Sequence, residues 1–432
     1  MLEEKIRKKT AKIGVIGLGY VGLPLAVGFA NAGFEVFGID SDPRKVRNIN
    51  KGCSDILDVG GKEVKTLVSK GKLHATLSYD ILSKLDTVSI CVPTPLGKTR
   101  EPDISFVMSA GREVAKRLKK SMLVILESTT YPGTTDELIL PLLSGKGLKA
   151  GKDFYLAFSP ERVDPGNGLF NTGNIPKVVG GITARCTKMA KLLYEQVCET
   201  VIPVSSSRIA EMVKLLENTF RSANIALVNE MALICDRMGI DVWEVVRAAA
   251  TKPFGFMPFY PGPGLGGACI PVDPYYLTWK SRLMGYEAKF IELAGEINRS
   301  MSEYVVDKIA DALNERRKSV KGSSILILGV AYKKDINDGR ESPAIEITDI
   351  LREKGAKLSY NDPLIPKMEF GGKVMKSVPL TGRVLGEADC VVIIADHSKY
   401  DFTWIASKSN LIVDTRNATG FLKKYRRKIV KL

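Results

Sequence analysis

The chain has 432 residues, 45% of them hydrophobic, and a formal net charge of +15. This length accommodates about three domains of ~100 to 200 residues each, and the apolar content can supply their cores. Two histidines and seven scattered cysteines without a CxxC pair argue against a histidine triad, a metal site and a disulfide framework. The basic residues are spread along the chain, so we expect no nucleic-acid partner, and no apolar run reaches the ~18 residues of a membrane span. We expect a folded, cytoplasmic protein.

Short apolar runs alternate with helical patterns, such as those at 23–32 and 104–118, through about residue 200. This alternation is typical of a parallel sheet that helices cover on both faces. A second strand series near the C-terminus predicts a second sheet of the same kind. The expected strands are 12–16, 35–39, 87–92, 123–126, 154–158 and 177–179 in the first series, and 324–328, 357–360, 390–395 and 411–414 in the second.

Between the two strand series, apolar residues recur at spacings of three and four. They predict one long helix from 206 to about 249 and another from 286 to 313. We therefore expect an α/β protein with two Rossmann-like, doubly wound parallel-sheet domains, at 1–203 and 304–432, joined by a central helical domain at 204–303.

The segment IGVIGLGYVGLPLA places Gly17, Gly19 and Gly22 in GxGxxG spacing between an expected strand and a helix. Such glycines allow a tight turn, bring the backbone close to a pyrophosphate and let the helix pack on the strand. Asp40 ends the second expected strand, where a carboxylate can bind the adenosine ribose of NAD and repel a 2'-phosphate. Nearby Arg44 complicates this preference for NAD over NADP without reversing it. A glycine turn without a ligand is the alternative.

The segment PGPGLGGACIPVDPYY sets Cys269 directly after a glycine-rich turn, with Asp273 four residues further on. A structural cysteine usually lies in an apolar run, whereas Cys269 lies where the backbone can come close to a ligand. Cys269 is therefore a candidate nucleophile, and a small residue filling a tight turn is the alternative. Five other cysteines fit core positions better, because Cys91 and Cys390 flank strand-like runs and Cys186, Cys198 and Cys235 fall in helical ones; Cys53 fits neither reading.

Polar side chains also mark a helix and two strand ends. Lys214 and Asn218 are four residues apart in EMVKLLENTFRSANIALVNE and so share one helical face, where they could stabilise an oxyanion or simply be surface residues. Thr129 and Glu161 follow expected strands, where open α/β sheets collect ligand groups. A turn-capping role is the alternative for both.

Taken together, these segments resemble the nucleotide-sugar 6-dehydrogenase family, which contains UDP-glucose, GDP-mannose and UDP-N-acetylhexosamine dehydrogenases. The resemblance covers nearly the whole chain, and TKPFGFMPFYPGPGLGG is most similar to enzymes that oxidise UDP-N-acetylglucosamine, with UDP-N-acetylmannosamine enzymes next. The matching segments are GLGYVGLPLA, CVPTPL, ESTTYPGTT, SPERVDPG, EMVKLLENTFR, GPGLGGACIPVDPYYL and LGVAYKKDINDGRESPA.

The resemblance implies that the sugar C6 alcohol is oxidised twice with NAD, through a thioester on Cys269 that water hydrolyses. Lys214 and Asn218 would then stabilise the oxyanion. It implies a UDP-sugar substrate, a UDP-binding C-terminal domain and a homodimer or higher homo-oligomer formed through residues 206–250.

Asp273, Glu161 and Thr129 would handle protons and water, with Asp273 and Glu161 as general acid or base in an order that the resemblance leaves open. The further residues that it implies are Tyr20, Val21, Pro93, Thr94 and Ser128 for the cofactor, beside Gly17, Gly19, Gly22, Asp40, Arg44 and Thr129, and Arg162, Phe259, Tyr260, Gly266, Lys333 and Arg340 for the substrate, beside Glu161, Lys214 and Asn218.

Two departures from the family pattern bear on these expectations. Ala268 stands where many relatives carry a polar residue before the cysteine, which would raise the pKa of the thiol and slow its step. The arginine of UDP-glucose enzymes has no match within 254–265, which argues against UDP-glucose. Alternatives are UDP-N-acetylmannosamine or UDP-glucose as substrate, a non-catalytic NAD and UDP-sugar sensor, and a nucleic-acid binder resting on net charge alone.

Overall fold

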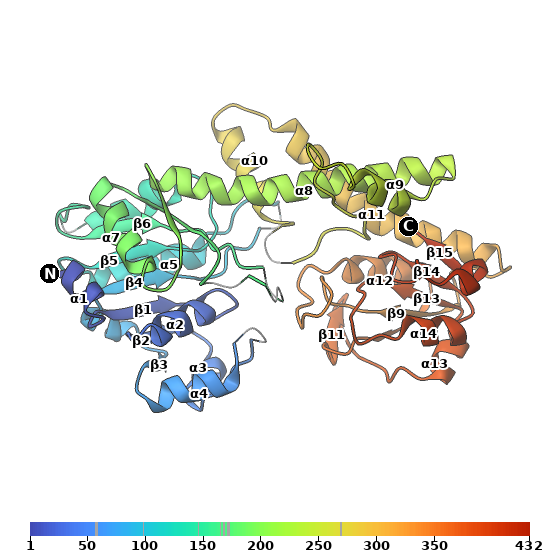
Figure 1. Ribbon diagram of the computed structural model, residues 1–432, viewed down its shortest axis with the longest axis horizontal. Helices are drawn as coiled ribbons and strands as arrows, with labels where there is room; N and C mark the ends of the chain where they lie inside the picture. Colours follow the sequence, from blue (N-terminus) through green and yellow to red (C-terminus); the bar gives the residue numbers. More distant parts are fainter. Residues whose placement is uncertain are drawn as a thin grey trace. The chain divides into compact units, whose positions relative to one another are not determined.

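The computed structural model describes residues 1–56, 59–97, 99–145, 147–164, 166, 169–170, 173–267 and 270–432. The chain divides into two compact units (Figure 1). The first unit comprises Met1–Glu217 and Tyr275–Tyr286, and the second comprises Asn218–Pro274 and Glu287–Leu432. No helix of the described residues is long and apolar enough to cross a membrane.

The first unit is built on an eight-stranded sheet with the order β3-β2-β1-β4-β5-β6-β7-β8. The order 3-2-1-4-5-6 is that of a dinucleotide-binding sheet, and all pairs from β3 to β6 are parallel, as expected. One pairing departs from the expected parallel sheet, because β7 runs antiparallel to β6. The strands are β1 Lys12–Ile16, β2 Glu35–Ile39, β3 Leu73–Thr76, β4 Thr87–Ile90, β5 Leu123–Leu126, β6 Tyr155–Phe158, β7 Lys177–Gly181 and β8 Val201–Val204.

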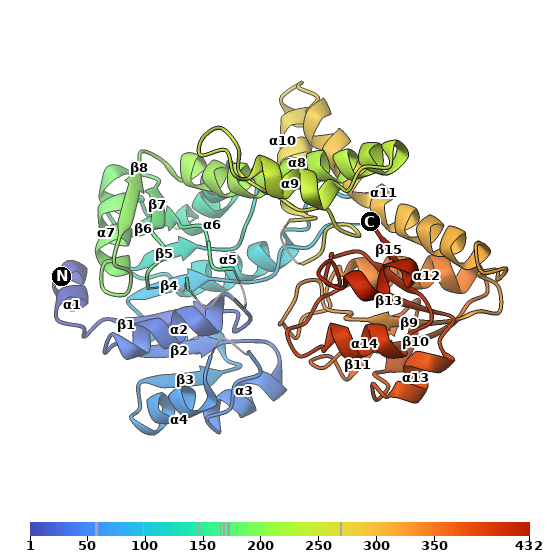
Figure 2. The same cartoon turned by 45° about the vertical axis from the view of Figure 1, so that its right-hand side comes forward.

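Helices cover both faces of this sheet (Figure 2). The core on one face is formed with α2, α3, α4 and α7, and the core on the other face with α5 and α6. Strands buried on both faces explain the nearly continuous apolar runs in the sequence. The helices are α1 Leu2–Arg7, α2 Gly22–Asn31, α3 Pro43–Asn50, α4 Gly61–Ser69, α5 Ser105–Arg117, α6 Leu140–Ser144 and α7 Ala184–Tyr194, with shorter turns η1 Tyr79–Lys84 and η2 Thr134–Ile139. Helix α10 Asp273–Leu283 belongs to the first unit from Tyr275 onward.

The expected long helix from 206 to 249 is two helices in the structure, α8 Ser207–Met238 and α9 Val242–Ala249. The break has a local cause, because Gly239 has a φ of +68°, which ends a helix at low steric cost. Asp241 then starts α9, and its side chain accepts hydrogen bonds from two backbone N–H groups. The other expected helix is α11 Lys289–Asn314.

The second unit contains a five-stranded sheet with the order β10-β9-β13-β14-β15, and all its pairs are parallel. The strand order reverses between β9 and β13, so the carboxyl ends of these strands form the edge where open α/β sheets bind ligands. Helices α11 and α12 pack on one face and α13 and α14 on the other.

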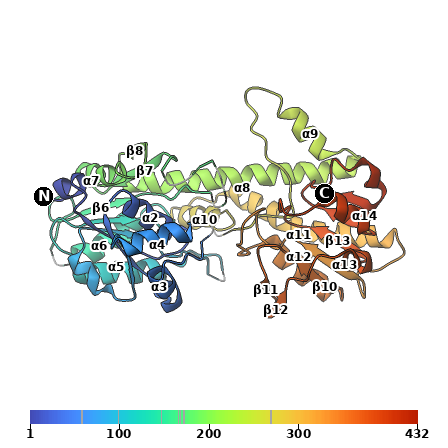
Figure 3. The ribbon, with the colours of Figure 1, turned by 60° about the horizontal axis from the view of Figure 1, so that its bottom comes forward.

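The strands of this unit are β9 Ser324–Leu328, β10 Lys357–Asn361, β13 Cys390–Ile393, β14 Ile412–Asp414 and β15 Ile429–Lys431. A hairpin of β11 Lys367–Phe370 and β12 Lys373–Lys376 follows the edge strand β10 (Figure 3). The remaining elements are α12 Pro343–Glu353, α13 Gly382–Glu387, α14 Phe402–Lys408 and the 3₁₀ turn η3 Lys423–Lys428.

Candidate active site

Two of the three glycines in the loop between β1 and α2 are tightly packed, and the third, Gly19, has open space beside it. Gly17 has a φ of +92°, and a Cβ there would lie 2.5 Å from the Cys91 carbonyl oxygen. A Cβ on Gly22 would lie 1.8 Å from the Gly17 oxygen, whereas a Cβ on Gly19 would meet no atom within 4 Å. The first and third glycines therefore hold the turn together, and the backbone at Gly19 is free for close approach by a pyrophosphate.

Asp40 follows β2 and braces this loop. Its carboxylate accepts hydrogen bonds from the backbone N–H of Leu18 at 2.8 Å and of Asp42 at 2.9 Å. The ammonium of Lys45, a residue that was not predicted from the sequence, lies 3.5 Å from the Asp40 carboxylate. The guanidinium of Arg44 lies 3.5 Å from the Asp42 carboxylate instead. The loop and its acidic neighbour fit NAD, because the carboxylate stands at the end of the second strand beside the glycine turn.

The other expected cofactor residues lie at the carboxyl ends of strands. Pro93 and Thr94 follow β4, and Ser128 and Thr129 follow β5, the adjacent strand in the sheet. The Ser128 hydroxyl donates to the Val92 carbonyl at 2.8 Å and so ties these two strand ends together. Tyr20 and Val21 lie in the turn before α2, with Val21 at its N-cap. All of them belong to the first unit, where the end of β4 packs against the glycine loop at Gly17.

Glu161 follows β6 and is held by three donors. Its Oε1 accepts from the backbone N–H groups of Arg162 at 2.7 Å and Val163 at 2.8 Å, and its Oε2 lies 3.0 Å from the Lys177 ammonium. Lys177 also contacts Glu127 at 2.8 Å, in a contact that the sequence did not reveal. The Arg162 guanidinium pairs with Glu217 at 2.7 Å.

Charge pairing outweighs burial for Glu161 and Lys177, whereas burial outweighs pairing for Glu127. Burial acts to raise the pKa of Glu161, but the Lys177 ammonium and the two backbone N–H groups hold the pKa of that carboxyl below its usual value. Burial also acts to lower the pKa of Lys177, but Glu127 and Glu161 raise it. Burial raises the pKa of Glu127 despite its contact with Lys177.

On α8, Lys214 is only 8% exposed, and its ammonium has no ion pair or hydrogen bond with any residue that the structure describes. One turn earlier, the buried Glu211 accepts hydrogen bonds from the backbone N–H groups of Gly133 at 2.7 Å and Thr135 at 2.9 Å. Burial raises the pKa of Glu211 to about 7. Glu211 thus fixes the start of α8 to the loop that follows Thr129, a connection that sequence spacing does not reveal.

In the second unit the Asn218 amide donates a hydrogen bond to the Asp273 carboxylate, and both side chains are buried. Cys269 and Ala268 lie outside the described residues. Phe259 packs edge to face on Phe220 with 5.9 Å between ring centroids. The structure therefore brings together two of the expected catalytic residues, Asn218 and Asp273, whereas Glu161, Thr129 and Lys214 belong to the first unit.

Four further residues that are expected to bind substrate belong to the second unit. Tyr260 is half exposed and stacks on Trp243, and Gly266 lies so close to Tyr332 that a Cβ would stand 2.5 Å from the Tyr332 Cβ. Lys333 follows β9. The guanidinium of Arg340 is already paired with the Asp338 carboxylate at 2.6 Å.

Two polar residues at the carboxyl edge of this sheet were not predicted from the sequence. Arg416 follows β14, and its Nε donates to the Ile394 carbonyl at 2.8 Å; burial lowers its pKa against the effect of Asp396 and Asp414. His397 follows β13 and is fully buried, with Nε2 3.0 Å from Asp362 and Nδ1 accepting from the Asp335 backbone N–H at 2.9 Å. Each residue lies two positions beyond the end of an expected strand, which is the signal that could have found them.

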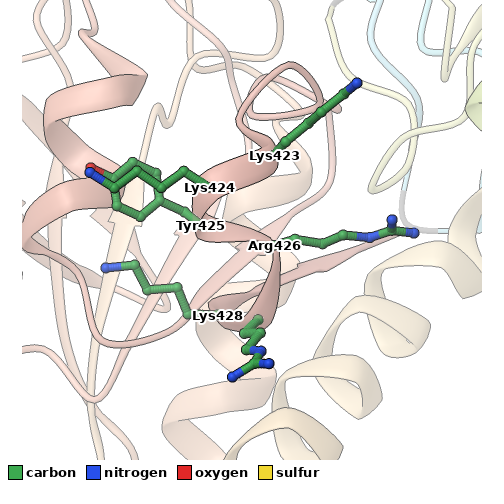
Figure 4. A pocket seen from close by; sticks show the side chains of 6 residues that line it. Lys423, Lys424, Tyr425, Arg426 and Lys428 are labelled. Carbon is green, nitrogen blue, oxygen red and sulfur yellow. The ribbon is translucent and has the colours of Figure 1, made fainter.

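A basic surface lies at η3, where Lys423, Lys424, Arg426, Arg427 and Lys428 surround Tyr425. Figure 4 shows their side chains pointing in different directions. The Lys428 ammonium donates a hydrogen bond to the Ser409 carbonyl oxygen at 2.7 Å. This run of cations, which the sequence analysis passed over, has no convergent geometry and belongs to none of the expected sites.

The dinucleotide-type sheet, its glycine loop and Asp40 are those of an NAD-binding domain, which a second doubly wound domain accompanies. Models of the UDP-glucose/GDP-mannose dehydrogenase family match the chain in order: the NAD-binding domain at 11–198, the central domain at 208–300 and the UDP-binding domain at 326–420. The chain belongs to the UDP-glucose/GDP-mannose dehydrogenase family, and it is an NAD-dependent nucleotide-sugar 6-dehydrogenase.

Three relatives illustrate the similarity. UDP-N-acetyl-D-glucosamine 6-dehydrogenase of Pseudomonas aeruginosa is 36% identical over 394 residues, covering 91% of this chain and 92% of that protein. UDP-N-acetyl-D-mannosamine dehydrogenase of Yersinia pestis is 37% identical over 421 residues, covering 94% and 98%. The structure of UDP-D-ManNAc dehydrogenase from Pyrococcus horikoshii superposes with a TM-score of 0.86 at 33% identity, covering 94% of this chain and 96% of that one.

Proposed function

We propose that the protein oxidises the C6 alcohol of a UDP-N-acetylhexosamine, with UDP-N-acetylglucosamine as the preferred substrate, to the uronic acid. Relatives named for UDP-N-acetylglucosamine and UDP-N-acetylmannosamine are about equally similar to the chain, at 36% and 37% identity. The segment TKPFGFMPFYPGPGLGG and the missing arginine within 254–265 favour the former sugar over UDP-glucose.

The observation that carries the catalytic assignment is the buried hydrogen bond between Asn218 and Asp273, because Asp273 follows Cys269 by four residues. The glycine loop and Asp40 would hold NAD, which would supply the hydride acceptor for both oxidations at C6. Between them the Cys269 thiol adds to the C6 aldehyde, and water finally cleaves the thioester to the acid and the free thiol. Lys214 and the Asn218 amide donate to the oxyanion at C6.

The Lys214 ammonium is buried and has no partner among the residues that the structure describes, which supports this role because such a cation is available to a developing negative charge. Asp273 orients Asn218, and Thr129 and Glu161 position water. The UDP group lies along the carboxyl edge of β9 and β13, with Lys333 and Arg340 as its cations. The NAD domain then spans 1–203, the central domain 204–303 and the UDP domain 304–432.

The substrate assignment is tested by the NADH formed per sugar consumed. UDP-N-acetylglucosamine, UDP-N-acetylmannosamine and UDP-glucose are offered separately with excess NAD. We expect two NADH per UDP-N-acetylglucosamine and the highest kcat/KM with this sugar. Faster turnover of UDP-N-acetylmannosamine would reassign the substrate. NAD and UDP-sugar binding without NADH from any of the three would instead support a sensor.

We also propose a homodimer formed through the exposed apolar face of α8. Within the second unit five large residues lie along one face of this helix and are exposed, and such a stripe on an isolated chain marks an interaction surface. They are Phe220, Leu227, Met231, Ile234 and Met238.

Leu227→Lys places a charge in the middle of this stripe and is expected to convert the dimer to a monomer, measured by light scattering at several protein concentrations. Arg221→Glu also changes charge on an exposed position of α8, but on another face, and should leave the mass unchanged. A wild-type chain that is monomeric throughout, or a Leu227→Lys variant that stays dimeric, would contradict this interface.

A further inference from the structure

Four side chains form a continuous network of hydrogen bonds and ion pairs in the first unit. The Tyr194 hydroxyl donates to Glu127 Oε1 at 2.5 Å, Glu127 Oε2 lies 2.8 Å from Lys177 Nζ, and the same ammonium lies 3.0 Å from Glu161 Oε2. They come from separate elements: Tyr194 ends α7, Glu127 follows β5, Lys177 begins β7 and Glu161 follows β6. The neighbouring strands of one sheet therefore bring them together.

Of these four side chains, only that of Glu161 is accessible to solvent. The side chains of Glu127 and Lys177 are 0% and 4% exposed, whereas that of Glu161 is 13% exposed. Removing charged groups from water is costly, and a buried ion pair often stabilises a fold no better than apolar packing would. Stability therefore does not explain well why Lys177 and Glu127 are buried. A better explanation is that they act on Glu161, which a substrate or a water molecule can reach.

We propose that Lys177 and Glu127 are positioning residues for the reaction, which orient the Glu161 carboxylate and keep it charged. This inference rests on the proposed function, in which Glu161 positions water. Lys177 fixes Oε2, while the backbone N–H groups of Arg162 and Val163 fix Oε1. Glu127 in turn neutralises Lys177 and holds its ammonium in place. A carboxylate with three donors is a weak base, so this geometry favours an oriented hydrogen-bond acceptor for water.

Other titratable groups face the cluster without donating to Glu161. Cys91 follows β4 and Cys198 follows α7, and burial raises the pKa of both thiols, so neither is a thiolate near neutral pH. The Arg162 guanidinium is paired with Glu217 on α8. Among the described residues, Lys177 is therefore the cation that directly contacts the Glu161 carboxylate.

The test compares the dependence of kcat on pH in three variants. In Lys177→Met the carboxylate loses its cation, its pKa rises, and the acid limb of kcat moves up by at least about one pH unit, with activity recovering at high pH. In Glu127→Gln the ammonium no longer divides its attraction between two carboxylates, so the acid limb stays in place or moves down. The neutral double variant Lys177→Met/Glu127→Leu removes both buried charges and should fold even if Lys177→Met does not, with the acid limb raised as in Lys177→Met.

A direct readout is the ¹³C titration of the Glu161 carboxyl in glutamate-labelled protein, assigned by its absence in Glu161→Gln. We expect this signal to titrate at higher pH in the variants that lack Lys177. The proposal would be overturned if the acid limb of kcat and the ¹³C titration of Glu161 fell at the same pH in the wild type and in every variant. It would also be overturned if the variants lacking Lys177 lost activity equally at all pH values. Absence of NADH in the wild type would instead contradict the proposed function, and the ¹³C titration would still decide the role of Lys177.

Discussion

Cys269→Ser is expected to lower steady-state NADH production by at least about a thousandfold. In the proposed mechanism the thiol carries the second oxidation, because the aldehyde has to be converted into a thiohemiacetal before C6 can lose another hydride. The first oxidation does not need the thiol. A single-turnover experiment on the variant should therefore give at most one NADH per active site, whereas the wild type gives two per sugar.

The matched control is Cys53→Ser, because Cys53 is an exposed thiol in the first unit and has no assigned role. Its turnover should equal that of the wild type. Two NADH per sugar at an unchanged rate in Cys269→Ser would remove the covalent route. Loss of NAD binding in the same variant would show that the substitution acts through folding, so NAD affinity is measured alongside.

Gly22→Ala is expected to weaken NAD binding by about 10- to 100-fold or more. The new Cβ would lie 1.8 Å from the Gly17 oxygen, and this atom belongs to the backbone of the turn itself. The turn and the start of α2 must then move apart, which displaces the N–H groups that face the pyrophosphate. Calorimetric titration with NAD measures the loss.

Gly28→Ala provides the comparison within the same helix. A Cβ at Gly28 would meet no atom within 4 Å, so it should stabilise α2 by about 0.5 to 1 kcal/mol and leave NAD affinity unchanged. Denaturant unfolding measures this gain. Equal NAD affinities for the two alanine variants would show that the close approach of Gly22 to Gly17 does not shape the site.

Strand positions were largely predictable because buried parallel strands are short apolar runs between helices. The runs at 12–16, 35–39, 123–126 and 324–328 are strands with those bounds, and both sheets are doubly wound as expected. The strands at 73–76 and 201–204 were missed, since the first includes His74 and the second Pro203. The short strands at 367–370, 373–376 and 429–431, each of which contains lysine, were missed as well.

Direction and helix breaks were harder to predict. The apolar pattern of β7 does not state which way the strand runs, so its antiparallel pairing with β6 could not be derived. The apolar periodicity of α8 continues into α9, so only Gly239 and Asp241 mark the break between them. Cys198, expected within a helix, lies just beyond the end of α7, although it is buried as expected.

Local spacing predicted candidate residues but not their partners. Asn218 and Asp273 are 55 positions apart, and Glu161 reaches Lys177 and Glu127 only because β5, β6 and β7 are neighbours in the sheet. Contacts of this kind follow from strand order, which a single sequence specifies weakly. The residue types at strand ends were nevertheless a sound guide to where polar groups gather.

The hydrogen bonds of His397 determine which ring nitrogen carries the proton. Because the Asp335 backbone N–H can only donate, Nδ1 must be bare, and the proton of the neutral ring sits on Nε2, toward Asp362. The chain has two histidines, and His74 lies at the surface. The imidazole ¹⁵N spectrum of isotope-labelled protein therefore contains two rings in contrasting surroundings, and the buried one reports, without any added probe group, whether the 329–335 loop is seated on the second sheet.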